Sequence, residues 1–139
     1  MGQQQLLLLT LGAIVVGLAL AIAFLMFDTQ AVASNRDAVT SDLSHLASMA
    51  QAYYRKPRVL GGGGHSFEGM TMDRLTSASV MPKSINGIYV LSPNPVSGNP
   101  LYVTLTGTGT ETGNDGATKV RVVMHVYADS IRVDAASMN

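Results

Sequence analysis

The side chains that could carry out chemistry are few and lie far apart along the chain. No cysteine is present, which excludes a thiolate nucleophile, a disulfide framework and the usual cysteine-based zinc site. The three histidines, His45, His65 and His125, belong to no HExxH motif and are too distant in sequence to suggest a metal site. No serine lies in a nucleophile elbow, and no pair of carboxylates stands out for acid–base catalysis. We therefore expect that the protein is not an enzyme and holds neither metal nor cofactor.

The strongest ligand candidate is the segment from Glu111 to Asp115. Glu111, Asn114 and Asp115 could offer oxygen ligands to Ca²⁺, but their spacing does not match the EF-hand loop. The run Gly113-Asn114-Asp115-Gly116 is also typical of a hairpin turn. We expect the segment to form a turn rather than a calcium site.

Four consecutive glycines, Gly61 to Gly64, could suggest a phosphate-binding loop. Such a loop requires GxxxxGK[ST] between a strand and a helix, whereas this run follows a predicted helix and leads into His65. We expect a sharp turn that folds the chain back from the helix.

The charge distribution gives no evidence for a nucleic-acid partner. The formal net charge is zero, and every Lys, Arg, Asp and Glu lies from Asp28 onward. Arg55, Lys56 and Arg58 cluster where a helix is expected to end, and the helix dipole favours cations there. An anion or phospholipid site is the alternative interpretation of this cluster. We expect no nucleic acid among the partners.

The element that dominates the chain is an uncharged apolar stretch from Leu6 to Phe27, which continues without proline into an amphipathic segment. At about 1.5 Å per residue, the stretch covers the hydrocarbon thickness of a bilayer. A cleaved secretory signal is disfavoured because Met1 to Gln5 contains no Lys or Arg and the apolar run is long. Pro57 forbids continuation, so the helix is predicted to end near Lys56.

Small residues line one face of the apolar stretch. Ala13, Gly17 and Ala21 lie four apart, so they share a helix face that another helix can approach closely. The alternative is that Gly and Ala are common in any membrane helix. We favour helix packing, and the predicted positions of contact with neighbouring helices are Gln5, Leu9, Ala13, Gly17, Ala21 and Phe24.

The amphipathic segment carries a narrow apolar stripe that repeats every seven residues with an intermediate position. Its members are Val32, Val39, Leu43, Leu46, Ala50 and Tyr53. Polar residues are expected on the other faces, namely Asp28, Asn35, Arg36, Asp37, Thr40, Asp42 and Gln51. The stripe could pack against its own globular domain, against neighbouring copies, or against both.

Beyond the glycine run the pattern changes to the two-residue period of strands. Four strands separated by turn residues are predicted, over Gly87–Ser92, Leu101–Gly107, Lys119–Tyr127 and Ser130–Val133. In the third strand, Val120, Val122, Met124 and Val126 are expected on the buried face. A short helix or turn is expected over 70–80, with Thr71 as its cap and Met72, Leu75 and Val80 facing inward.

Together these elements predict an α+β fold. A long N-terminal helix over 1–56, apolar over 6–27 and an amphipathic stalk over 28–56, is expected to pack on a small C-terminal antiparallel sheet of about four strands. The globular β domain would span 57–139 and begin with the glycine-rich connection at 61–64.

The stretches Asn35-Arg36-Asp37-Ala38-Val39, Asp42-Leu43 and Ala50-Gln51-Ala52-Tyr53-Tyr54-Arg55-Lys56-Pro57 lie within this architecture, just before the glycine run. In this combination the chain resembles type IV pilins and related pseudopilins. The resemblance implies subunits that wait in the inner membrane, where a peptidase trims and methylates the N-terminus. Pilus assembly machinery would then extract them into an extracellular helical filament of identical subunits, with the apolar helices at its centre.

Two features of the N-terminus depart from the family. The family usually places a glutamate a few residues into the mature helix, whereas this chain has only glutamines there. If Met1 is the first mature residue, Gln5 occupies the matching position and can hydrogen-bond but cannot form an ion pair. The family's short basic leader ends in glycine, so either a leader precedes this sequence or Gly2 is itself the pre-cleavage glycine.

Three functions are carried forward from the sequence. The first is the structural subunit of a type IV pilus-like filament, whose role in adhesion, motility, DNA uptake or a biofilm the sequence does not separate. The second is a pseudopilin of a secretion system. The third is a single-pass membrane-anchored binding protein that does not polymerise.

Overall fold

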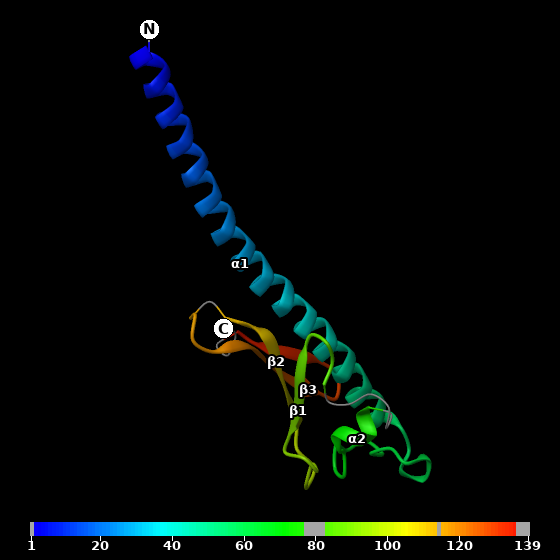
Figure 1. The fold of residues 1–139 in the computed structure, drawn as a ribbon. Coiled ribbons are helices and arrows are strands. Elements are labelled where there is room, and N and C mark those ends of the chain that lie inside the picture. Colours follow the sequence, from blue (N-terminus) through cyan, green and yellow to red (C-terminus); the bar gives the residue numbers. More distant parts are fainter. Residues whose placement is uncertain (1, 77–82, 114, 136–139) are drawn as a thin grey trace.

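A computed structural model describes residues 2–76, 83–113 and 115–135 of the chain. Helix α1 (Gly2–Arg55) has 54 residues, and only its second half lies beside the sheet, so its N-terminal half projects alone (Figure 1). The helix ends just before Pro57, which cannot continue it. The predicted α+β fold, with a long N-terminal helix packed on four antiparallel strands, is confirmed.

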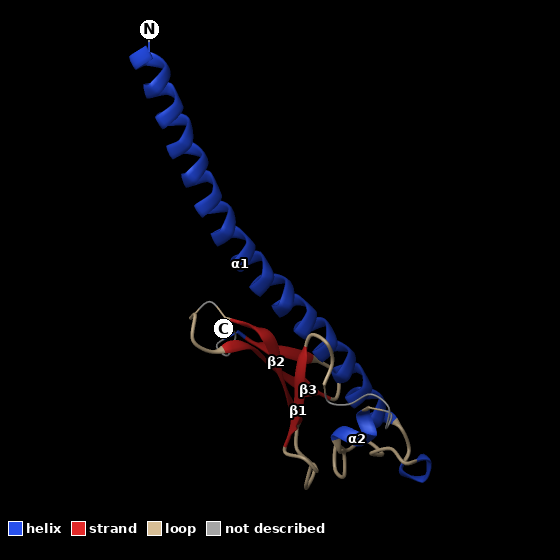
Figure 2. Ribbon diagram, in the orientation of Figure 1, coloured by secondary structure: helices blue, strands red, loops and turns tan. Residues whose placement is uncertain are grey.

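The sheet is a simple antiparallel meander in the order β1-β2-β3-β4, set against one side of α1 (Figure 2). Its strands are β1 (Gly87–Ser92), β2 (Tyr102–Thr112), β3 (Lys119–Tyr127) and β4 (Ile131–Asp134). The bounds predicted for β1 and β3 are confirmed, and β4 begins and ends one residue later than expected.

The second strand was predicted to end at Gly107, and this was wrong. Strand β2 continues to Thr112, because Gly107 pairs with Tyr89 and Gly109 pairs with Gly87 in an unbroken ladder with β1. Glycine is normally a weak strand residue, but both glycines here are buried beneath α1. The register with β3 then shifts between Thr108 and Thr112, at a bulge.

The core lies between the second half of α1 and the inner face of the sheet. Helix α1 contributes the buried residues Val39, Leu43, Leu46, Ala47, Ala50 and Tyr53. The sheet contributes Tyr89, Leu91, Val103, Leu105, Val120, Val122, Met124 and Val126. The apolar stripe of the stalk therefore packs on the chain's own sheet from Val39 to Tyr53, whereas Val32 is only partly buried.

The glycine run forms the expected sharp turn and caps α1. Gly61 and Gly64 have positive φ angles of 79° and 57°. The backbone N–H of Gly63 donates to the carbonyl of Tyr53 at 2.8 Å, and the N–H of Gly64 donates to that of Lys56 at 2.9 Å. Carbonyl groups that the end of a helix leaves unpaired are satisfied in this way.

The connection between the glycine turn and the sheet contains little regular structure. It includes the 3₁₀ helix η1 (Arg58–Leu60) and the single-turn helix α2 (Met72–Leu75). Helix α2 is shorter than the predicted segment over 70–80, and Thr71 takes the N-cap position without a capping bond from its side chain. Met72 and Leu75 are buried as predicted, and Val80 lies outside the described residues.

Candidate functional site

The first half of α1 is an apolar surface that the rest of the described chain leaves exposed. From Leu6 to Phe27 every residue except Ala23 is exposed. The large apolar side chains there keep between 53% of their surface, at Leu11, and 71%, at Phe27, accessible to solvent. By length and composition the helix could cross a membrane, and none of its most apolar window, of mean hydropathy 2.8, is buried. Contiguous apolar surface of this extent is strongly unfavourable in water and needs a cover.

The predicted packing positions all lie on this exposed surface. Gln5, Leu9, Ala13, Gly17 and Ala21 succeed one another at intervals of four, and Phe24 follows three residues later. A β-carbon added at Gly17 would meet no atom within 4 Å, so the small face is open to a second helix. The contacts themselves stay a prediction. Gly2 begins α1, and Met1 lies outside the described residues.

The second half of α1 is fixed to the sheet by three polar latches, Asn35, Asp42 and Gln51. Asn35 donates from Nδ2 to the carbonyl of Asn86 at 3.0 Å, and its Oδ1 accepts from the N–H of Thr110 at 3.1 Å. Thr110 lies in the bulge of β2, where the ladder with β3 is interrupted. Asn35 therefore satisfies a strand donor that the bulge leaves outside the ladder.

Asp42 is the centre of the second latch. Its Oδ2 accepts hydrogen bonds from the Tyr89 hydroxyl, from Ser84 Oγ at 2.9 Å and from Asn86 Nδ2 at 3.0 Å. Burial opposes ionisation of this carboxyl, but the three hydrogen bonds outweigh burial and lower its pKa below 3.8. Burial and the bond to Asp42 raise the pKa of Tyr89 to about 12. Helix, β1 and the loop before β1 are thereby joined through one carboxylate.

Gln51 completes the set on the opposite edge of the sheet. Its Nε2 donates to the carbonyl of Tyr127 at 3.1 Å and to that of Ser130 at 3.3 Å, both at the β3–β4 turn. The expectation that Asn35, Asp42 and Gln51 lie on faces away from the packing stripe was wrong. Asn35 and Asp42 lie seven residues apart, the same interval as in the apolar stripe. This spacing could have indicated that both side chains face the sheet together with the stripe.

Two glycines of β2 allow α1 to lie close to the sheet. A β-carbon on Gly107 would lie 2.6 Å from Val39 Cγ1 and 3.1 Å from Leu43 Cδ1. A β-carbon on Gly109 would collide with Asn35 Oδ1. Packing of the stripe and engagement of the Asn35 latch therefore both depend on the absence of side chains at these positions.

The calcium candidate is built as a turn. The Asp115 carboxylate accepts from the N–H of Ala117 at 3.1 Å and from the N–H and hydroxyl of Thr118. These bonds lower the pKa of Asp115, and they are the bonds of a hairpin turn. The turn interpretation is confirmed for Asp115, whereas Asn114 lies outside the described residues.

The histidines lie apart in space as well. His45 and His65 are exposed, and half-buried His125 places Nδ1 3.1 Å from Thr104 Oγ1 on the outer face of the sheet. Among the residues that the structure describes, no three His, Cys, Asp or Glu side chains gather as metal ligands. The described residues therefore combine a sheet that is hydrogen-bonded to the second half of α1 with an exposed apolar first half, which could anchor in a membrane. Comparison with protein families, curated proteins and solved structures finds no match for this chain.

Proposed function

We propose that this chain is the structural subunit of an extracellular type IV pilus-like filament and resides in the inner membrane before assembly. The observation that supports this most is the division of α1 into two halves. One half is covered by the chain's own sheet, and the other, from Leu6 to Phe27, is apolar, uncharged and uncovered. A surface of that kind suits lipid, and it equally suits a bundle of identical helices.

Transfer between these two environments is the mechanism that we propose. Lipid tails and leucine side chains are similarly apolar, so moving the helix from bilayer to filament axis can be nearly neutral in free energy. Close packing at Gly17 and its neighbours would then favour the bundle. Gln5 lies on the same face, exposed, where its amide can hydrogen-bond to a neighbouring helix without placing a charge in the bundle.

The alternatives differ in what covers the apolar half. In a pseudopilin, copies would cover it in a short assembly only, whereas in a membrane-anchored binding protein lipid would cover it permanently. The latches favour an assembled subunit over an anchored binding protein, because they fix the sheet to the stalk. Sheets that form the repeating outer layer of a filament need one fixed position on their helices. A tethered binding domain has no such requirement.

The experiment that tests the proposal is cryo-electron microscopy of filaments sheared from cells, with mass spectrometry of the N-terminal peptide from the same sample. We expect filaments of this chain with Leu6 to Phe27 bundled at the axis, and the mass spectrum shows whether Met1 is processed. Recovery of the chain from the membrane fraction alone, with no filament, would contradict the proposal and favour the anchored protein.

A further inference from the structure

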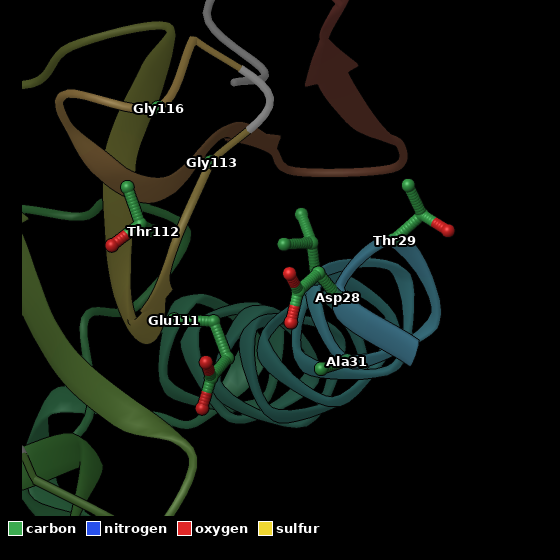
Figure 3. A pocket seen from close by; sticks show the side chains of 8 residues that line it. Asp28, Thr29, Ala31, Glu111, Thr112, Gly113 and Gly116 are labelled. Atoms are coloured by element: carbon green, nitrogen blue, oxygen red, sulfur yellow. The ribbon is translucent and has the colours of Figure 1, made fainter. Parts of the chain in front are cut away.

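Two surface hollows of opposite charge lie at the two ends of the sheet-bearing part of the molecule. The first, here called the proximal hollow, lies between α1 just after its apolar half and the β2–β3 turn (Figure 3), and it has a volume of about 510 Å³. Its lining is Asp28, Thr29, Ala31, Val32, Glu111, Thr112, Gly113 and Gly116. Its charged side chains, Asp28 and Glu111, are both acidic and exposed.

The second, here called the distal hollow, lies where α1 ends against α2 and the glycine turn. It has a volume of about 370 Å³ and is lined by Met49, Ala52, Tyr53, Lys56, Gly61, Arg74 and Leu75. Its charged side chains, Lys56 and Arg74, are both basic and exposed. The distal hollow is therefore the electrostatic complement of the proximal one.

The four charges are available for a partner. Within the described residues the one ion pair joins Arg58 to Glu68 at 3.4 Å, outside both hollows, and Asp28, Glu111, Lys56 and Arg74 take no part in it. Opposite charges do lie nearby in sequence, since Asp73 precedes Arg74 and Lys119 pairs with Thr112 across the hairpin, but neither lines a hollow. Each hollow thus has one sign of charge.

Exposed apolar side chains accompany the charges at both ends. Met26 and Phe27, 60% and 71% exposed, immediately precede the proximal hollow. Val59 and Leu60, 96% and 65% exposed, lie in η1 next to the distal one. Burying these residues against each other would add a hydrophobic contact beside the charge pairs.

The distance between the hollows is close to the length of helix that needs a cover. With a rise of about 1.5 Å per residue, the centres of the helix residues that line the two hollows lie roughly 32 Å apart along α1, and the part from Gly2 to Phe27 is roughly 38 Å long. A copy shifted by that distance would place its distal hollow at the proximal hollow of the first copy. Its sheet domain would then lie beside the first copy's uncovered apolar half.

From this match we infer that the distal hollow of one copy docks on the proximal hollow of a second copy, with Lys56 and Arg74 facing Asp28 and Glu111. The inference rests on the proposed filament function and specifies the contact that sets the axial repeat. Such a contact uses two different patches, so each copy presents a free patch to the next. The axial shift between neighbouring copies keeps the chain of contacts from closing into a ring.

Cysteine cross-linking tests this contact cleanly because the chain has no cysteine of its own. The double variant Glu111→Cys with Arg74→Cys, assembled into filaments and oxidised, is expected to give a ladder of disulfide-linked dimers, trimers and longer chains. Either single variant alone should give monomers, and a mixture of the two single variants should give dimers and nothing longer. Filaments that form normally but yield no ladder would overturn the inference and leave the proposed function intact.

Charge exchange gives an independent measurement at the same positions. Arg74→Glu and Glu111→Lys are each expected to lower the yield of sheared filaments several-fold, and the two together should restore it. Both side chains are exposed, so a circular dichroism melt of each variant should match that of the unmodified chain. Failure of the double variant to recover would overturn the contact. Absence of filaments from the unmodified chain would instead overturn the proposed function together with this inference.

Discussion

The two halves of α1 are one continuous helix with opposite relations to the rest of the molecule. In the second half Val39 and Leu43 have no accessible surface, whereas in the first half Leu9 and Phe27 each expose 71%. Both halves are rich in apolar residues, so hydrophobicity alone does not separate them. The difference is that the second half packs on the sheet of the same chain, whereas the described residues leave the first half exposed.

The halves also differ in whether directional hydrogen bonds fix them to a partner surface. The second half has its polar latches, which fix the helix in one register on the sheet. In the first half, the hydroxyl of Thr10 bonds only to the carbonyl of Leu7 in its own helix, and no Lys, Arg, Asp or Glu is present. A surface without directional bonds can exchange lipid for protein, whereas a latched surface cannot.

Replacing Gly17 by leucine should produce the largest effect, confined to the first half. The bulky side chain would keep helices apart at the small face, so filaments should be lost while the sheet domain keeps its melting temperature. Electron microscopy counts the filaments, and circular dichroism measures the melt. Gly12→Leu is the matched control, since Gly12 is equally open but lies on a different helix face. Normal filament yield from Gly17→Leu would contradict the packing face.

Replacing Leu43 by alanine should affect the second half in the opposite way. Leu43 is fully buried between α1 and the sheet, so the change should cost about 2–5 kcal/mol of unfolding free energy. Leu18→Ala, at a residue that is 61% exposed, should cost close to nothing. Urea denaturation of both variants in detergent measures the difference. Equal destabilisation by the two substitutions would remove the distinction between the halves.

Adding a methyl group at Gly107 tests how closely the second half is packed. The new β-carbon of Gly107→Ala would lie 2.6 Å from Val39 Cγ1, so overpacking should cost about 1–3 kcal/mol. Thr106→Ala, on the outer face of the same strand, is the control and should change the unfolding free energy little. An unchanged urea midpoint for Gly107→Ala would show that the helix can move away from the sheet without loss.

Truncating Asn35 tests the first latch. In Asn35→Ala the N–H of Thr110 and the carbonyl of Asn86 lose their partner. Water can replace it at the exposed Thr110 N–H, but only in part at the half-buried carbonyl of Asn86. The loss should be about 1 kcal/mol. Hydrogen exchange should locate the loosening at the end of β2 and the start of β1. Faster exchange spread evenly over the sheet would argue against a local latch.

Periodicity, together with proline and turn residues, was sufficient to predict the fold class. The seven-residue stripe, Pro57 and the alternating third strand each impose one local structure, and the structure has all three. The end of β2 was not predictable in the same way, because Gly107 and Gly109 are weak strand residues whose role depends on α1 lying above them. Tertiary contact outweighed local propensity at that point.

The spacing of Asn35 and Asp42 was visible in the sequence, but the groups that they bind were not predictable, for a related reason. A polar residue beside an apolar stripe is usually solvated, and only the sheet's position shows that Asn35 and Asp42 reach backbone and hydroxyl groups across the junction. The apolar first half shows the reverse case. Its exposure follows directly from the sequence, but the identity of what covers it depends on molecules outside the chain, so filament packing at Gly17 stays a prediction.

The smallest expected effect is the pH dependence of the second latch. The pKa of Asp42 is lowered on folding, so its contribution to stability is complete above about pH 4 and is lost as the pH falls through the folded-state value. Tyr89 behaves oppositely, because a pKa raised from 10.0 to about 12 contributes stability that is complete below pH 10.0 and is lost as the pH rises toward 12.

The acidic and the alkaline slopes of unfolding free energy against pH can be separated by removing one group at a time. Tyr89→Phe should abolish the alkaline decline in unfolding free energy, and Asp42→Asn should flatten the acidic one, when urea midpoints are compared across both pH ranges. Because Asp42 and Tyr89 share one hydrogen bond, Tyr89→Phe should also weaken the acidic decline. Independent slopes would mean that the helix and β1 are joined by separate contacts. Coupled slopes would identify this carboxylate as the point that holds the covered half of α1 in register on the sheet.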